Sequence, residues 1–147
     1  MRAASYTSAD LHRLLAHRHP FLLVDHVDVV EPGRRVVGTK LLSASEWWAQ
    51  SDVAAPFPFV LVLEALAQTS GALLEHLTDG AQGAIAYFMG ANCVRLRTAA
   101  RAADRLTLDV SLAHWRRGIC RTKGVARLGN GAVVMTAQLT TIVRGIA

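Results

Sequence analysis

The sequence contains few cysteines and no long apolar run. Its two cysteines, Cys93 and Cys120, form no CxxC pair and have no metal-ligand spacing around them, so we expect neither a disulfide framework nor a metal site. We interpret both as small, buried or half-buried thiols in a reducing compartment. The most apolar run, residues 57–63, ends at Glu64 and is too short to span a bilayer, so no membrane insertion is expected.

Acidic residues are also scarce, since 11 Asp and Glu stand against 16 Lys and Arg, a formal net charge of +5. The arginines are scattered or alternate along predicted strands without an aromatic-rich groove, which argues against nucleic-acid binding. A basic surface also suits an acidic protein partner, because it steers that partner's approach. The N-terminal segment MRAASYTSADLHRLL lacks the apolar stretch of a secretory signal, so we expect a cytoplasmic protein.

The chain has no repeat, low-complexity segment or linker. Its 147 residues, 52% hydrophobic and 18% charged, are typical of one globular domain, which we expect to cover residues 1–147. A domain of this length buries enough surface to fold without disulfides.

The N-terminal part predicts one short helix and two strands. Ser8 is expected to cap a helix over residues 10–16, with Asp10 in its first turn. Residues 21–30 and 35–42 are rich in Val and Leu and predict strands, joined by a turn at Glu31-Pro32-Gly33.

The C-terminal part predicts an antiparallel meander. Apolar and polar residues alternate in 105–112, which is typical of a half-buried strand. After a turn at 116–118, the next strand has small residues on its inner face, which suggests that something packs closely there. Asn130-Gly131 predicts a hairpin, and alternation returns in 133–139. Strands at this spacing favour a mainly antiparallel sheet.

The longest helical segment runs from about Phe57 or Pro58 to Leu77 and is closed by Asp79-Gly80. Its first five turns are apolar on nearly every side, so we expect a buried helix. The simplest architecture is an α+β fold with a curved antiparallel sheet wrapped around one long central helix, the hot-dog fold.

Glu64 is the one ionisable residue between positions 57 and 74. A carboxylate inside an apolar helix must be paired, hydrogen-bonded or neutralised. Desolvation raises the pKa of a buried carboxyl group, which would make Glu64 a usable general acid. Gln68 follows one turn later and could orient Glu64 or a bound amide. The helix pattern alone also allows Glu64 to lie on an exposed stripe or to pair with an arginine.

Two motifs resemble the bacterial (3R)-3-hydroxyacyl-acyl-carrier-protein (ACP) dehydratases. Residues 17–25, HRHPFLLVD, resemble that family's N-terminal motif, with His19 where an aromatic residue is usual. Residues 63–68, LEALAQ, look like its central-helix motif. The resemblance runs from about Leu15 to Val143, with 117–119 and 123–126 in the family's order.

The resemblance implies a dehydration reaction at a site shared between two subunits of a dimer. In the family a histidine and the helix carboxylate act on the substrate, and an N–H at the helix start polarises its thioester carbonyl. The family uses no metal or organic cofactor, because the substrate arrives on the phosphopantetheine arm of an acidic ACP. Glu64 matches the carboxylate, and the resemblance places the substrate-binding positions at Gln68, Phe59, Val60, Phe88 and Gly90.

The family's catalytic histidine has no counterpart here. The family has two aromatic residues, then Gly-His-Phe-Pro; in this chain Trp47-Trp48 are followed by AQSDV. Gln50 or Ser51 occupies the histidine position, depending on which motif is used for alignment. Neither can replace an imidazole base. The family's Pro-Gly at the helix start reads Pro58-Phe59, so scaffold motifs are retained while chemistry motifs are altered.

Three interpretations remain open. The first is a dehydratase subunit, for fatty-acid or polyene/polyketide-type acyl chains, that shares its site with a histidine-bearing homologue. The second is a self-sufficient enzyme, either a dehydratase with Asp52 or His26 as base or an acyl thioesterase using Glu64. The third is a non-catalytic protein that binds acyl chains or ACP. Homodimer and heterodimer are equally open.

Several other residues are secondary candidates. Arg95, Arg97 and Arg101 could contact the carrier protein, although a solvated face is an alternative. His17 and His19 are expected to belong to the scaffold. A group of aromatic residues and one methionine could line an acyl tunnel or pack in the core: Trp47, Trp48, Phe57, Phe59, Phe88 and Met89.

Overall fold

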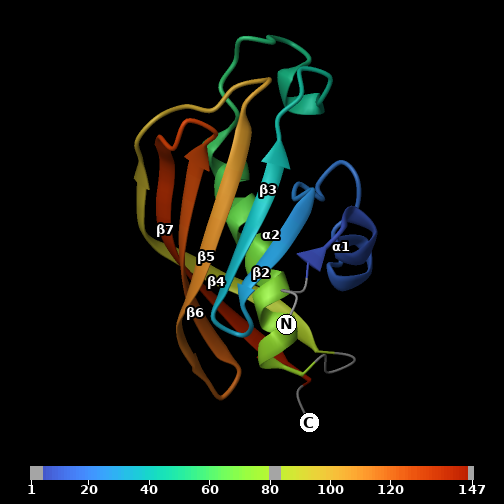
Figure 1. The fold of residues 1–147 in the computed structure, drawn as a ribbon, viewed down its shortest axis with the longest axis vertical. Coiled ribbons are helices and arrows are strands. Elements are labelled where there is room, and N and C mark those ends of the chain that lie inside the picture. The colour runs from blue at the N-terminus through green and yellow to red at the C-terminus, as the bar shows by residue number, and fades with distance from the viewer. Residues whose placement is uncertain (1–4, 80–83, 146–147) are drawn as a thin grey trace.

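The computed structural model describes residues 5–79 and 84–145. They form a seven-stranded antiparallel sheet that curves around one long helix (Figure 1). Across the sheet the strands run in the order β1-β2-β3-β5-β6-β7-β4. In chain order the elements are β1 (Ser5–Tyr6), α1 (Ser8–Leu14), β2 (His26–Glu31), β3 (Arg35–Leu41), the 3₁₀ turn η1 (Trp47–Ala49), α2 (Phe59–Leu77), β4 (Ile85–Leu96), β5 (Arg105–Arg116), β6 (Ile119–Leu128) and β7 (Val133–Arg144). The predicted architecture is confirmed.

The core lies between the inner face of the sheet and α2. Leu106, Leu108 and Val110 of β5 are fully buried, as the alternation predicts. On β6 the small residues of the inner face allow α2 to pack closely against the sheet. A Cβ added to Gly124 would lie 3.1 Å from Leu66 Cδ2, so a larger side chain would push α2 off the sheet.

The two predicted C-terminal turns are confirmed. Gly118, between β5 and β6, has φ +78°, and a Cβ there would lie 2.6 Å from the carbonyl oxygen of Val143. Gly131, between β6 and β7, has φ +88°. Glycine is the residue that adopts such positive φ values without strain, so both turns require it.

The first helix begins earlier than predicted. It spans Ser8–Leu14 rather than 10–16, and Thr7 rather than Ser8 is its N-cap. The Thr7 hydroxyl accepts from the N–H of Asp10, and the Asp10 carboxylate accepts from the N–H of Thr7. This capping box satisfies donors at the start of the helix, and hydrogen bonds from Thr7 lower the pKa of Asp10.

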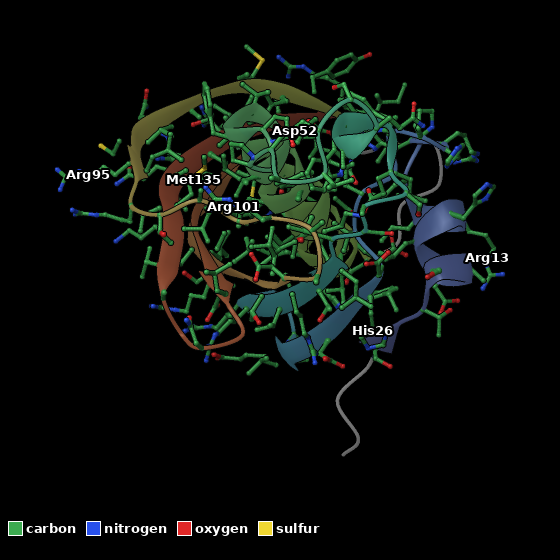
Figure 2. All side chains as sticks on the ribbon, turned by 90° about the horizontal axis from the view of Figure 1, so that it is seen from above. Arg13, His26, Asp52, Arg95, Arg101 and Met135 are labelled. Carbon is green, nitrogen blue, oxygen red and sulfur yellow. The ribbon has the colours of Figure 1, made fainter. Side chains whose placement is uncertain are left out.

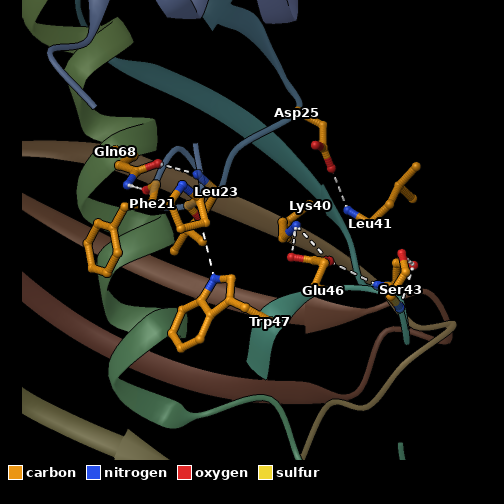
Figure 3. A network of polar contacts seen from close by, with 11 residues as sticks. Phe21, Leu23, Asp25, Lys40, Leu41, Ser43, Glu46, Trp47 and Gln68 are labelled. Atoms are coloured by element: carbon orange, nitrogen blue, oxygen red, sulfur yellow. Dashed lines mark hydrogen bonds and ion pairs between the residues drawn. The ribbon is translucent and has the colours of Figure 1, made fainter. Parts of the chain in front are cut away.

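The predicted strand over residues 21–30 is only partly correct, because β2 begins at His26. Immediately before it, the N–H of Asp25 still donates to the carbonyl oxygen of Thr39 on β3, but the backbone of Phe21 and Leu23 bonds to a side chain of α2. Gln68 donates to the carbonyl oxygen of Phe21 at 2.8 Å and accepts from the N–H of Leu23 at 2.9 Å (Figure 3). A side chain that bonds to backbone groups competes with the strand ladder, and here it prevents the ladder from extending.

Helix α2 begins at Phe59, with Pro58 at the N-cap, and ends at Leu77 as predicted. Gly80, part of the predicted helix stop, lies outside the described residues. The expectation of burial on every side is wrong, because Phe59 and Val60 are about half exposed, at 53% and 54%. The first turn of the helix is therefore uncovered in the single chain, and the stripe that continues from Val60 along Glu64, Ala67 and Gly71 is only partly covered. Within the described part of the chain no helix is long and apolar enough to cross a membrane.

Strand β4 was not predicted from the sequence. It lies at the edge of the sheet beyond β7 (Figure 1) and is exposed along most of its length. Its exposed residues include Ile85, Tyr87, Phe88 and Met89. Apolar residues on both faces give no alternation, which is why the pattern was missed. An exposed, apolar edge strand is typical of a surface that pairs with another chain.

Cys120 is buried on β6, whereas Cys93 is exposed. Burial raises the pKa of the Cys120 thiol to about 11, so the unreactive thiol form dominates at pH 8. We expect Cys120 to remain unlabelled by iodoacetamide in the native protein and to react fully in denaturant, as peptide mass spectrometry would show. Native labelling of Cys120 at the rate of a free thiol would contradict its placement.

Candidate active site

Glu64 lies on α2 along the partly uncovered stripe, and its side chain is 26% exposed. One carboxyl oxygen, Oε1, has two partners. Gln68 donates to it from Nε2 at 2.9 Å, and His17 Nε2 lies 3.0 Å from it. Oε2 has no hydrogen-bond partner within the described part of the chain. Glu64 is therefore anchored on one side and available on the other, and its desolvation is only partial.

Gln68 is 2% exposed and joins Glu64 to the loop before β2. One of its amide hydrogens goes to Glu64. The other goes to the carbonyl oxygen of Phe21, and its oxygen accepts from the N–H of Leu23 (Figure 3). Since all these groups are engaged within the chain, the geometry favours the orienting role of Gln68 over direct contact with a substrate.

His17 is the residue near Glu64 that the sequence reasoning missed. It was assigned to the scaffold together with His19. His17 and Glu64 lie 47 positions apart in the sequence, so no helix or strand periodicity relates them. His17 also lines a mostly apolar pocket of about 250 Å³, here called the His17 pocket, together with Leu15, Gly71, Leu74, Glu75 and neighbouring residues. The pocket follows α2 from the level of His17 toward the C-terminal end of the helix. His17, whose Nε2 lies 3.0 Å from Glu64 Oε1, thus also borders an apolar cavity, whereas Glu64 is not among the residues that line it.

The start of α2 provides free backbone donors. The N–H groups of Leu61 and Val62 bond to the carbonyl oxygen of Pro58, whereas those of Phe59 and Val60 have no acceptor within the described residues. A helix N-terminus with free N–H groups stabilises negative charge, including that on a polarised carbonyl oxygen.

A second apolar pocket of about 410 Å³, here called the helix-start pocket, lies beside these donors. It is lined by Pro56–Phe59, Val62, Val134 and residues 96–100. The ring of Phe59, where the family has glycine, borders this pocket instead of filling it. Substitution of glycine by phenylalanine therefore leaves space beside the helix start.

The segment that lacks the histidine follows η1. Gln50 and Ser51 are exposed, and no hydrogen bond joins either to Glu64 within the described residues. Asp52 accepts from the N–H of Ala54 in an exposed turn. His26, the other alternative base, pairs with Asp28 on β2 at 3.0 Å. The structure brings none of these four residues into contact with Glu64.

The aromatic candidates divide into two groups. Trp48 and Phe57 are buried and pack edge to face with ring centroids 5.1 Å apart, so they belong to the core. Trp47 and Phe59 are about half exposed on the side of the uncovered helix stripe. Phe88, Met89 and Gly90 lie on the edge strand β4, where they would reach a site only if another chain covers that strand.

Arginines flank the helix-start pocket. Arg97 lines it, and Arg95 and Arg101 are exposed on either side of the lining segment. Figure 2 shows Arg95 at the margin of the molecule. Among the described residues, no group of three or more His, Cys, Asp or Glu side chains is placed to hold a metal ion.

Comparison with known proteins supports a family assignment. Residues 15–138 match the model of the FabA-like domain family. The 3-hydroxyacyl-[acyl-carrier-protein] dehydratase FabZ of Acidovorax sp. (strain JS42) is 38% identical over 145 residues, covering 94% of this chain and 99% of that protein. The protein of the same name from Chloroflexus aggregans (strain MD-66 / DSM 9485) is 44% identical over 116 residues, 78% of each chain.

Solved structures confirm the fold. The dehydratase heterocomplex ApeI:P from Xenorhabdus doucetiae includes a chain with a TM-score of 0.73 and 19% identity, covering 90% of this chain and 89% of that one. A mutant of the thioesterase PA1618 from Pseudomonas aeruginosa has a TM-score of 0.71 and 14% identity, covering 92% of each. With its full-length relatives and its curved sheet around α2, this chain belongs to the FabA-like family, the hot-dog proteins that include the 3-hydroxyacyl-ACP dehydratases.

Proposed function

We propose that this chain is a subunit of a 3-hydroxyacyl-ACP dehydratase and that it supplies the carboxyl group of Glu64 to an active site shared with a related chain. The observation that supports this most strongly is the difference in contacts between the two carboxyl oxygens of Glu64. Its Oε1 accepts a hydrogen bond from Gln68 at 2.9 Å and lies 3.0 Å from His17 Nε2, while its Oε2 has no hydrogen-bond partner among the described residues. The relatives named as dehydratases of this substrate class support the reaction type.

The reaction removes water across two carbons of the acyl chain. A base takes the proton from C2, the electron pair forms the C2–C3 double bond, and the C3–O bond breaks. The departing hydroxyl takes the proton of Glu64 and leaves as water. Return of the proton from the base to Glu64 restores both groups. A base and an acid are sufficient for this elimination, so the scheme includes no metal or organic cofactor. The acyl chain is carried on the phosphopantetheine arm of ACP.

The two pockets provide space for such a substrate on either side of Glu64. At 1.5 Å per residue, Glu64 stands about 7.5 Å along the helix from Phe59 and about 10 Å from Gly71. The thioester would lie at the helix-start pocket, where the N–H groups of Phe59 and Val60 polarise its carbonyl. The acyl chain would extend past Glu64 into the His17 pocket. Arg95, Arg97 and Arg101 would then face the acidic carrier.

The base comes from outside this chain. No histidine lies between Trp47 and Glu64, and the resemblance puts Gln50 or Ser51, depending on the alignment, where the family carries it. The exposed stripe of α2 and the edge strand β4 offer an apolar surface for a second hot-dog subunit. Such a partner would cover Phe59, Val60, Phe88 and Gly90 and would bring its own histidine toward Glu64.

Loss of water from a 3-hydroxyacyl-ACP, followed by mass spectrometry, tests this proposal. We expect no dehydration by the chain alone and dehydration when it is mixed with a histidine-bearing homologue from the same source. The same spectra report hydrolysis of the thioester, the product of a thioesterase. Full dehydration by the chain alone, or hydrolysis without water loss, would rule out the shared-site subunit.

A further inference from the structure

We propose that Glu75 limits the length of the acyl chain that this subunit accepts, so that its substrates are 3-hydroxyacyl chains of up to about 12 carbons. This inference rests on the proposed function, because it concerns the acyl chain that would extend into the His17 pocket. Its basis is the chemistry of that pocket. Most of the side chains that line it are apolar, and Glu75 is the one acidic side chain among the described residues of its lining.

Glu75 lies on the same stripe of α2 as Glu64, farther toward the C-terminal end of the helix. Positions 64, 71 and 75 are seven and four residues apart, spacings that place side chains on one face of a helix. Gly71 and Glu75 both line the pocket. At 1.5 Å per residue, Gly71 stands about 10 Å and Glu75 about 16 Å along the helix from Glu64. A chain that passes Glu64 therefore meets Gly71 first and Glu75 second.

These spacings convert into a chain length. An extended hydrocarbon chain advances by about 1.3 Å per bond. With C3 of the substrate at Glu64, about eight further bonds reach the level of Gly71 and about 13 reach the level of Glu75, which correspond to chains of roughly 11 and 16 carbons. The side chains of a helix all lean toward its N-terminus, so the two carboxyl groups keep this separation along the axis. A chain of 16 carbons would thus end beside the carboxyl group of Glu75.

The wall of the pocket at the level of Gly71 is apolar. A Cβ added to Gly71 would lie 2.5 Å from Leu15 Cδ2, so Leu15 packs directly against the helix at this position. Leu15 and Leu74, which both line the pocket, are buried. The last carbons of a chain that ends here would contact apolar side chains, which favours their binding.

The Glu75 carboxylate has no cation to pair with, since no ion pair joins it to another side chain in the described part of the structure. Burial and the charge of Glu75 raise the pKa of the Tyr6 phenol, but the Tyr6 hydroxyl already lies 3.2 Å from His76 Nε2. Glu75 is half-buried, so water can still solvate its carboxylate. A long apolar chain would displace this water without supplying a hydrogen bond, which is unfavourable for a charged group.

Binding of decanoyl-pantetheine and hexadecanoyl-pantetheine to the isolated full chain, measured by calorimetry at concentrations below their aggregation, tests this limit. The isolated chain suffices because the residues that line the pocket belong to it. We expect the wild type to bind the decanoyl thioester at least as tightly as the hexadecanoyl thioester. Glu75→Leu should shift the ratio of the two Kd values at least about 10-fold in favour of hexadecanoyl, because no charge is then desolvated, and Glu75→Gln should shift it less. Glu31→Leu, which removes an exposed carboxylate of β2 outside the pocket, should keep the wild-type ratio.

A hexadecanoyl thioester with a hydroxyl group on its terminal carbon separates this effect from a general gain in hydrophobicity. Its hydroxyl can donate to the Glu75 carboxylate, so the wild type should bind it more tightly than the methyl-ended chain, and Glu75→Leu should reverse that order. Tighter binding of hexadecanoyl than of decanoyl by the wild type, an unchanged ratio in Glu75→Leu, or no binding of any of these thioesters would overturn the inference.

Turnover separates this inference from the proposed function. The mixture contains a histidine-bearing homologue whose helix carboxylate is replaced by an amide, so that water loss depends on Glu64. Glu75→Leu should raise kcat/KM for 3-hydroxyhexadecanoyl-ACP about 10-fold relative to that for 3-hydroxydecanoyl-ACP. An active mixture with the same ratio in wild type and variant would overturn the role of Glu75 and leave the proposed function standing. An inactive mixture with the expected binding ratios would count against the proposed function while leaving the effect of Glu75 on the pocket established.

Discussion

Replacement of Glu64 by Gln is expected to lower the rate of water loss by the active complex about 100- to 10,000-fold, the range that a general acid contributes. The variant removes the transferable proton while it keeps the shape of the side chain. Its amide oxygen can still accept from Gln68, which donates to Oε1 in the native protein. The fold and the binding of ACP should therefore be unchanged. Mass spectrometry of the acyl-ACP product measures the loss.

The matched control for this variant is Glu75→Gln. Glu75 lies on the same helix, is partly buried and lines the His17 pocket, but it has no contact with Glu64 or His17 in the described structure. We expect it to retain kcat within about three-fold, since a group that touches no reacting atom contributes little to the barrier, whereas its place in the pocket proposed for the acyl chain would affect KM. Equal losses in the two variants would indicate a general effect of helix charge and would remove Glu64 from its assigned role.

Replacement of Lys40 by Met should produce the largest loss of stability among single charge removals near the site. The Lys40 side chain is 7% exposed, and its Nζ lies 3.0 and 2.9 Å from the two carboxyl oxygens of Glu46 (Figure 3). Glu46 also accepts from the N–H of Ser43. The variant leaves the Glu46 carboxylate without its paired cation. We expect a decrease of about 2–3 kcal/mol in the free energy of unfolding, less than for a fully enclosed pair because Glu46 is partly exposed.

Urea unfolding measures this loss, and the double variant Lys40→Met/Glu46→Gln is its control. Removal of both charges should recover part of the stability, because an uncompensated buried charge is the main cost. Trp47 and Trp48 directly follow Glu46, so their fluorescence should report a rearranged loop in the single variant. A change below about 0.5 kcal/mol, the range of ordinary surface substitutions, would show that the pair is not structurally important.

The sequence predicted elements whose residues alternate or repeat along one face. The strand over 105–112, the small inner face of β6, the Asn130-Gly131 hairpin and the end of α2 were all confirmed. In each, the local pattern and the tertiary packing agree, because the buried face is covered within the same chain.

Prediction from the sequence failed where the structure depends on contacts between residues far apart in the sequence or on surfaces that this chain does not cover. The apolar stripe of α2 predicted burial, but in this chain Phe59 and Val60 are uncovered, since periodicity identifies apolar faces without showing what covers them. Residues 21–25 were predicted as strand because their bonds to Gln68 have no local signal. The pairing of His17 with Glu64 was missed for the same reason, although both motifs had been singled out.

The second subunit that we propose would account for both the uncovered apolar surface and the missing histidine. Strand β4 is the free edge of the sheet, and Phe88 is half exposed on it. An apolar edge of this kind is stable in solution when another strand pairs with it. A partner on this edge would also supply the base, so association and activity should be gained together.

The most direct test of the shared site uses a histidine-bearing homologue whose own helix carboxylate has been replaced by an amide. This disabled partner is mixed with the present chain, and water loss from 3-hydroxyacyl-ACP is measured. We predict that the mixture is active, that the disabled partner alone is inactive, and that Glu64→Gln in the present chain abolishes the activity of the mixture. An inactive mixture with the disabled partner, where the intact partner is active, would show that Glu64 does not serve the partner's histidine and would contradict the account.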